Sequence, residues 1–344
     1  MRATAQVPRV VSERPTAQQN FAYSYWKLPI AIGLAGFLLY FALRGVEWKR
    51  VGSIVVHCRV GYLMLACACG TLSYIVRAMR WRILLSAQEK LAYTTVLWAS
   101  SVGYLANNYL PARAGELVRT AMISSRSQLS KTYVFTTAMT ERVIELVILV
   151  FMASLMSLTL AHRPMWLVRL MLLTTVSALA ATAFFLLLPW VDRARTGLVT
   201  RLPVSGRTKD RLHGIAENVT LALTALRDPL RLFQVCGATT IVWTLDATAA
   251  VILARALGMH LLFSVAVLLS TGLAIGNALP STPGAVGIFQ FAAVTVLTPF
   301  NYTQTEAIAY ILVAQAAGYV VITTLGLIGL WRYRLTGTTE TGRL

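Results

Sequence analysis

The stretch from Ser101 to Gly115 reads Ser-Val-Gly-Tyr-Leu-Ala-Asn-Asn-Tyr-Leu-Pro-Ala-Arg-Ala-Gly, and a related stretch from Ser270 to Gly284 reads Ser-Thr-Gly-Leu-Ala-Ile-Gly-Asn-Ala-Leu-Pro-Ser-Thr-Pro-Gly. Six positions carry the same residue in both stretches without a gap, each 169 positions later in the chain. Proline removes a backbone donor and breaks a helix, and glycine permits the turn that follows. The asparagine before the break can bond the freed backbone groups or a ligand. Each stretch therefore predicts an apolar helix that is broken near its end.

The composition places these broken helices in a membrane. Of the 344 residues, 57% are hydrophobic and 13% are charged, and the mean hydropathy is +0.65. A soluble domain carries about 25% charged residues, so these values argue against a soluble globular enzyme, and they exclude a disordered chain. Because about 20 apolar residues in a helix cross about 30 Å of hydrocarbon, the sequence predicts an all-α polytopic membrane protein.

Apolar runs of suitable length predict about six full spans, which cover residues 28–43, 60–76, 133–160, 166–190, 232–256 and 306–331. Two further runs, 92–110 and 261–279, end at the broken stretches, and a third piece covers 284–299. We expect these further runs to form two re-entrant hairpins. A chain of eight or nine full spans is the alternative.

The net charge of +18 orients the chain. Of 31 Lys and Arg residues, 23 fall in five segments, namely 1–27, 77–90, 111–131, 191–231 and 332–344. Positive charge collects on the cytoplasmic side of membranes and meets anionic headgroups there. All five segments share one side only if one broken stretch enters and leaves by the cytoplasmic face and the other by the outer face. This predicts that both termini are cytoplasmic and that the protein is integral to the inner membrane.

The predicted organisation is a polar N-terminus over 1–27, one transmembrane domain over 28–332 and a cytoplasmic tail over 333–344. Related segments in opposite orientation divide the domain into repeats of about 28–165 and 166–332. The basic segment 44–59 fits only as an interfacial helix on the outer surface, because Trp48, Val51, Ile54 and Val55 have helical spacing.

Paired Gly/Pro-interrupted segments in two halves point to the binding site of a transporter. The candidate substrate-binding residues are Asn108, Pro111, Arg113, Gly115, Glu116, Arg119, Asn277, Pro280, Ser281, Thr282, Gly284 and Gln290. The first tip is cationic and the second is neutral, which suits capture of an anionic headgroup inside and release outside. The alternatives are ordinary duplicated Pro-Gly turns and, for the cationic tip, a solvated helix start.

Four ionisable residues lie within apolar runs, where charge is costly and usually faces a cavity or a partner. They are Glu141, Arg142, Glu145 and Asp246. Arg142 can reach Glu145 one turn later. Asp246 is a candidate for proton coupling, for pairing with Arg113 or Arg142, or for a structural hydrogen bond. A Glu-Arg pair kept for helix packing is the other interpretation.

Three arginines, Arg77, Arg80 and Arg82, close the second run beside Trp81. We expect them to anchor anionic lipid headgroups rather than to bind substrate. The four cysteines and four histidines are scattered, so no metal or cofactor site is predicted. No nucleic-acid motif accompanies the positive charge, and no ATP-binding Gly-rich loop is present.

At these motifs the sequence resembles the flippase-like transmembrane family named for the membrane portion of lysylphosphatidylglycerol synthase. The resemblance is carried by Arg77 with Arg80-Trp-Arg82, the run from Asn108 to Arg119, Glu141-Arg142, and the run from Asn277 to Gly287. It covers about residues 28–332 and implies translocation of lipids between leaflets, including polyprenyl-linked and hopanoid-associated lipids in relatives. The sequence ends about twelve residues after its last apolar run, so we expect no soluble acyltransferase domain.

The first hypothesis is therefore a non-enzymatic lipid flippase or transporter, with membrane lipids of anionic headgroup as partners. A scaffold for a lipid or envelope biosynthetic pathway, in contact with its enzymes, is the second. An intramembrane enzyme that modifies lipid headgroups is the third, with Glu141, Glu145 and Asp246 as its candidate carboxylates. A carrier of small soluble anions is the last.

Overall fold

The computed structural model describes residues 27–110, 114–160, 228–278 and 283–340, with isolated residues 165, 168, 169, 172, 175, 176, 179, 180, 221 and 226. Within these ranges the regular structure is helical. The α-helices are α2 (Lys27–Leu43), α3 (Trp48–Val56), α4 (Val60–Leu85), α5 (Tyr93–Tyr109), α6 (Gly115–Ser124), α7 (Lys131–Ser157), α10 (Pro229–Ala256), α11 (Phe263–Ala278), α12 (Ile288–Leu297) and α13 (Gln304–Glu340). Two 3₁₀ turns, η3 (Pro283–Ala285) and η4 (Thr298–Phe300), flank α12.

Three of these helices are long and apolar enough to cross a bilayer: α4, α10 and residues Gln304–Leu335 of α13. The prediction of an all-α protein with apolar helical spans is thus confirmed. Helix α7 has 27 residues, enough for about 40 Å at 1.5 Å per residue, and carries the predicted intramembrane charges. The predicted span 166–190 lies mostly outside the described residues.

Two helices extend past their predicted ends. Helix α4 continues from the apolar run 60–76 to Leu85, through the three arginines that we expected to close it. Helix α13 continues from the run 306–331 to Glu340. A hydropathy pattern ends where charge begins, but a helix continues when its charged side chains have partners, as those of α4 do.

Each broken stretch forms two short helices that pack against each other: α5 with α6, and α11 with α12. Helices α6 and α12 have 10 residues each, or about 15 Å, half the hydrocarbon thickness. In the first pair the backbones touch, since a Cβ built on Gly115 lies 2.0 Å from the carbonyl oxygen of Gly103. The Gly115 N–H donates to Asn107 Oδ1 at 2.9 Å, so an asparagine side chain satisfies the first turn of α6.

The second break is held by glycines and amides. Gly287 has a φ of 89°, and a Cβ there would lie 2.3 Å from the Ala35 carbonyl oxygen of α2. Its N–H donates to Gln290 Oε1 at 2.7 Å, and Gln290 Nε2 donates to Gln315 Oε1 of α13 at 2.6 Å. Gln315 Nε2 donates in turn to the Gly284 carbonyl at 3.1 Å. The break is therefore tied to α13 by two side chains.

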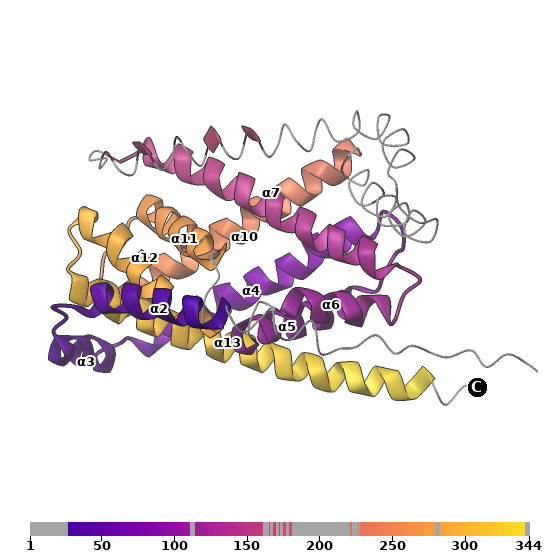
Figure 1. Cartoon of the computed structure of the whole chain (residues 1–344), viewed down its shortest axis with the longest axis horizontal. Coiled ribbons are helices and arrows are strands. Elements are labelled where there is room, and N and C mark those ends of the chain that lie inside the picture. The colour runs from indigo at the N-terminus through magenta and orange to yellow at the C-terminus, as the bar shows by residue number, and fades with distance from the viewer. Residues whose placement is uncertain are drawn as a thin grey trace, which may run out of the picture.

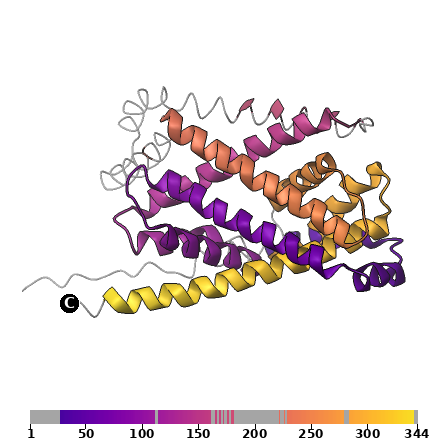
Figure 2. The ribbon, with the colours of Figure 1, turned by 180° about the vertical axis from the view of Figure 1, so that it is seen from behind.

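Helices α4 and α10 pack side by side through the middle of the molecule (Figures 1 and 2). They run antiparallel, because the Arg59 N–H at the start of α4 donates to the carbonyl of Ala256 at the end of α10 at 2.8 Å. Helix α5 packs on α13, and α11 packs on α7. Helix α2 covers α12, and α3 packs on α13.

Apolar side chains form two buried clusters, and the charged residues lie between them. Along α7, Val134 and Ala138 belong to one cluster and Ala153 to the other. Glu141 and Glu145 lie between these positions and are buried. The fold thus places a polar layer in the middle of an apolar helix bundle.

Candidate functional site

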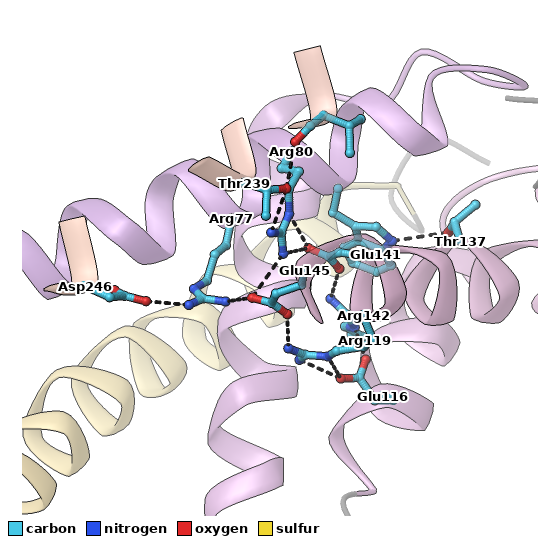
Figure 3. A network of polar contacts seen from close by, with 12 residues as sticks. Arg77, Arg80, Glu116, Arg119, Thr137, Glu141, Arg142, Glu145, Thr239 and Asp246 are labelled. Carbon is cyan, nitrogen blue, oxygen red and sulfur yellow. Dashed lines mark hydrogen bonds and ion pairs between the residues drawn. The ribbon is translucent and has the colours of Figure 1, made fainter. Parts of the chain in front are cut away.

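Three arginines and three glutamates alternate in a closed ring of ion pairs at the centre of the bundle (Figure 3). The order around the ring is Arg80, Glu141, Arg119, Glu116, Arg142, Glu145 and back to Arg80. We refer to these six residues as the charge ring. Each glutamate contacts at least two arginines, so the charges of the ring cancel.

The contacts of the ring have hydrogen-bond geometry at most steps. Arg80 donates to Glu141 Oε1 from Nη2 at 2.6 Å and from Nε at 3.1 Å. Arg119 Nη1 donates to Glu141 Oε2 at 3.0 Å, and its Nε forms an ion pair with Glu116. Arg142 Nη2 donates to Glu116 Oε1 at 2.8 Å.

Glu145 completes the ring. It accepts from Arg142 Nη1 at 2.8 Å and lies 3.6 Å from Arg80 Nη2. The last of these contacts is an ion pair without a hydrogen bond.

A fourth arginine carries the network into the second half of the chain. Arg77 Nη1 donates to Glu145, and Arg77 Nη2 donates to Asp246 Oδ2 of α10 at 2.6 Å. Arg80 Nη1 also reaches α10, where it donates to Thr239 Oγ1 at 3.2 Å. Four arginines and four carboxylates therefore form one neutral network across α4, α6, α7 and α10.

Local helix geometry explains how the sequence builds this network. Residues three or four apart share a helix face, which groups Arg77 with Arg80 on α4 and Glu141 with Glu145 on α7. Arg142 pairs with Glu145 in the same way. The break at the first hairpin then places α6 against α7, so that α6 brings its own acidic and basic residue to the ring.

Burial divides the network into a closed side and an accessible side. The side chains of Arg80, Glu141 and Arg119 are at most 2% exposed, whereas Arg142 is 36% and Asp246 is 26% exposed. Buried ions require full pairing, because removing a charge from water costs several kcal/mol. A ligand can therefore first reach the network at Arg142 and Asp246, while Arg80, Glu141 and Arg119 lie deeper in the bundle.

Two tryptophans add their ring faces to the arginines. The guanidinium carbon of Arg119 lies 4.4 Å from the centroid of Trp81, and that of Arg77 lies 5.2 Å from the centroid of Trp243. Trp81 Nε1 donates to Thr137 Oγ1 at 3.2 Å, which fixes the ring. Among the described residues, Arg119 Nη2 has no hydrogen-bond partner, so this buried guanidinium has a spare donor.

A comparison with family models identifies residues 28–326 as the transmembrane region of lysylphosphatidylglycerol synthase. The chain belongs to this family. The searches of curated proteins and of solved structures returned no match. The match covers every member of the charge ring and both broken stretches, as the resemblance of the motifs indicated.

Several predicted site residues come together in this family's fold. Glu116, Arg119, Glu141, Arg142 and Glu145 are all members of the charge ring. Asp246 pairs with Arg77, rather than with Arg142 as the sequence left open.

The predicted lipid anchors separate in the structure. Arg77 and Arg80 turn inward to the network, while Arg82 is exposed and donates from Nε to the Leu91 carbonyl at 2.8 Å. Of the three, only Arg82 has the exposure that an anchor needs, and its lipid contact stays a prediction.

The hairpin tips are described only in part. Pro111, Arg113, Pro280, Ser281 and Thr282 lie outside the described residues. Asn108 is partly buried near the end of α5, and Asn277 is exposed near the end of α11. Gly115, Gly284 and Gln290 have backbone-positioning roles at the two breaks, since each takes part in the close packing or the hydrogen bonds described above.

Sequence reasoning missed four residues that the structure brings to these sites: Asn107, Trp81, Thr239 and Gln315. Asn107 stands beside the predicted Asn108, and Trp81 stands between two predicted arginines, so adjacency was an available signal. The sequence carried no such signal for Thr239 and Gln315, because their partners are 159 and 25 residues away in the chain.

In the described ranges, no group of three or more His, Cys, Asp or Glu residues is placed to hold a metal ion. The network can exchange partners, because a guanidinium binds a phosphate in the same bidentate geometry in which it binds the carboxylate of a glutamate.

Proposed function

We propose that this protein is a lipid transporter that moves a lipid with an anionic headgroup between the leaflets of the inner membrane. Arg119 and the tips of the broken helices capture the headgroup, with Arg113 of the first tip as a further cation. The observation that carries the proposal is the buried charge ring with a spare donor on Arg119. Polyprenyl-linked and hopanoid-associated lipids remain within the proposed class.

The position of the ring supports transport. Ionisable residues at membrane depth are expensive and mark substrate pathways or relays. Glu141 lies about 15 Å along α7 from Lys131, well inside the helix. Since the ring is neutral without a ligand, it is stable at this depth, and its arginines can exchange a glutamate for a headgroup phosphate.

The order of helices supports an inverted repeat. Helix α4 starts at Val60 and α10 at Pro229, which is 169 residues later, the offset of the two broken stretches. In both halves a long helix, two short helices and another long helix follow in the same order. The two corresponding long helices, α4 and α10, run antiparallel, which is the relation that an inverted repeat requires.

Matching contacts support the same relation. Helix α5 of the first half packs on α13 of the second half, and α11 of the second half packs on α7 of the first half. These two contacts are equivalent under the relation between the halves. In the first half, Glu116 of α6 pairs with Arg142 of α7; in the second half, Gln290 of α12 pairs with Gln315 of α13. The same connection is ionic in one half and neutral in the other, which supports a headgroup site in the first half.

The lengths of the short helices support re-entrant hairpins, because neither α6 nor α12 can cross the membrane. The breaks also approach each other. The rings of Tyr109, at the end of α5, and Tyr319 are 6.2 Å apart, and a Cβ on Gly284 would meet the Tyr319 hydroxyl. Hairpins that enter from opposite faces would meet in this way near the middle of the bilayer.

The alternatives are weaker on the same observations. An enzyme needs a carboxylate that can exchange protons with its substrate, whereas Glu116, Glu141, Glu145 and Asp246 are each bound to arginine. A scaffold gives no reason for the spare donor on a buried arginine.

A leaflet-exposure assay in proteoliposomes tests the proposal. Fluorescent phosphatidylglycerol and phosphatidylcholine are compared for the wild type and for Arg119→Lys, which keeps the charge but loses the Nη2 donor. We expect the wild type to move phosphatidylglycerol and the variant to be at least tenfold slower. Chromatography of the recovered lipid should show no covalent change.

Arg50→Gln is the matched control, because Arg50 is half exposed and pairs with Glu306 at the surface at 3.4 Å. We expect it to transport as the wild type does. Equal rates for wild type and Arg119→Lys would overturn the role of Arg119, and a covalently altered lipid would favour the enzyme. Absence of movement for every lipid would favour the scaffold.

A further inference from the structure

Arg77 and Asp246, which form the ion pair between α4 and α10, are separated in the chain by 169 residues. This is the offset that relates the two broken stretches and the starts of α4 and α10. Arg77 and Asp246 therefore occupy the same position in the two repeats.

Two symmetry-equivalent residues that contact each other lie beside the two-fold axis, one on each side of it. If α4 and α10 are related by a pseudo-two-fold axis, the Arg77–Asp246 pair lies on that axis. In alternating access the two halves rock about a central site, so the groups on the axis are equally distant from both faces. An ion pair there joins the halves at the point that both states share.

Asp246 differs from the three glutamates of the network in three respects. It is the only one of the four carboxylates that comes from the second half. It contacts a single arginine, while each glutamate contacts at least two. Its side chain is 26% exposed, against 13% or less for the glutamates. It is therefore the carboxylate that is held least and reached most easily.

We propose that Asp246 is an internal counter-anion that the headgroup phosphate of the lipid displaces from Arg77. This exchange breaks the ion pair that joins the two halves. This inference rests on the proposed function and names how the same network is opened. Arg77 keeps Glu145 on Nη1 and gives its Nη2 to the phosphate. The Trp243 face beneath the guanidinium holds it in place during the exchange.

Charge explains why the exchange favours an anionic lipid. When Asp246 is displaced, Arg77 keeps Glu145 as its one negative partner. The phosphate of a headgroup with net negative charge then takes the place of the Asp246 carboxylate. A phosphatidylcholine headgroup brings its own cation next to Arg77, where like charges repel. Arg77 thus sets the preference for an anionic headgroup, and Asp246 competes with that headgroup for the arginine.

Native mass spectrometry of the purified protein in an equal mixture of phosphatidylglycerol and phosphatidylcholine tests this. Asp246→Asn keeps the size of the side chain and removes the competing charge. We expect its bound ratio of phosphatidylglycerol to phosphatidylcholine to rise at least threefold, and its transport of phosphatidylglycerol to slow at least tenfold because the headgroup is not released. Asp246→Ser gives an independent measurement if the asparagine variant does not fold.

Two controls separate the exchange from a general charge effect. Glu306→Gln removes a carboxylate with the same 26% exposure at the surface, and it should leave the ratio unchanged. The double variant Arg77→Gln/Asp246→Asn should lose the gain in binding. A wild-type ratio in Asp246→Asn, or a gain that persists in the double variant, would overturn the inference.

The outcome is separable from failure of the proposed function. If the binding ratio shifts as expected but no lipid moves in any variant, the exchange at Arg77 stands and transport fails. If the wild type transports while the ratio and rate of Asp246→Asn stay as in wild type, transport stands and Asp246 is only structural.

Discussion

Arg119 lies over Trp81, with its guanidinium carbon 4.4 Å from the ring centroid, and both side chains are buried. A guanidinium hydrated this poorly depends on the ring face as well as on its glutamates. The stack joins the charge ring to the apolar cluster that contains Trp81. The stability of the bundle therefore depends on the same arginine that we propose as a ligand of the headgroup.

The Trp81 stack predicts a graded loss of stability. Trp81→Phe keeps a ring face but loses the hydrogen bond to Thr137, and we expect a loss of about 1–2 kcal/mol in the free energy of unfolding. Trp81→Leu also removes the cation–π contact and leaves a cavity, with an expected loss of about 3–5 kcal/mol. Unfolding in detergent measures both, with the exposed Trp48→Leu as control. Equal losses for the two variants would contradict the role of the ring face.

The buried position of Glu141 predicts that losing its charge costs much more unfolding free energy than breaking an ion pair at the surface. Glu141→Gln leaves Arg80 and Arg119 short of a negative partner in the closed side of the ring, and removing one partner of a buried pair costs about 3–5 kcal/mol. Glu306→Gln breaks the surface pair with Arg50 and should cost at most about 1 kcal/mol. Chemical denaturation of both variants checks this, and a loss below 1 kcal/mol for Glu141→Gln would refute it.

The contact between Gly103 and Gly115 predicts that the first hairpin rejects any side chain. In Gly115→Ala the new Cβ would lie 2.0 Å from the Gly103 carbonyl oxygen, so α5 and α6 must separate. We expect a loss of about 1–3 kcal/mol, the usual effect of overpacking, with slower transport. Gly237→Ala on α10 is the control, since nothing lies within 4 Å of its Cβ and alanine favours helix. Similar thermal stability of the two variants would show that the hairpin can open.

The charge distribution predicts which side of the membrane each surface faces. In a background with all four native cysteines replaced, Lys49→Cys on α3 should react with an impermeant maleimide added to intact cells. Arg334→Cys near the end of α13 should react only after permeabilisation, if the termini are cytoplasmic. Both side chains are exposed in the bundle. The reverse pattern would invert the proposed orientation.

Local patterns allowed much of the fold to be predicted. The run 92–110 anticipated α5 at Tyr93–Tyr109, and the proline and glycine of each broken stretch anticipated the short helices that follow. The ends of α4 and α13 were placed too early, because hydropathy counts charges without regard to their partners. Once Arg77 and Arg80 are paired, continuing the helix costs less than ending it.

The charge ring was predictable only in part. The pairing of Arg142 with Glu145 follows from i,i+3 spacing alone. The pairs of Arg80 with Glu141 and of Arg119 with Glu141 join residues on different helices that are 61 and 22 positions apart in the chain. Spacing carries no information on which helices meet, so these contacts depended on the packing of α4, α6 and α7.

The neutrality of the network has an electrical consequence. Four arginines offset four carboxylates there, so the net charge of +18 belongs entirely to residues elsewhere. Moving one elementary charge through a potential of 100 mV involves about 2.3 kcal/mol, but a neutral group that rocks in the field transfers none. In the transport that we propose, a current that accompanies the movement of lipid therefore includes no contribution from this network.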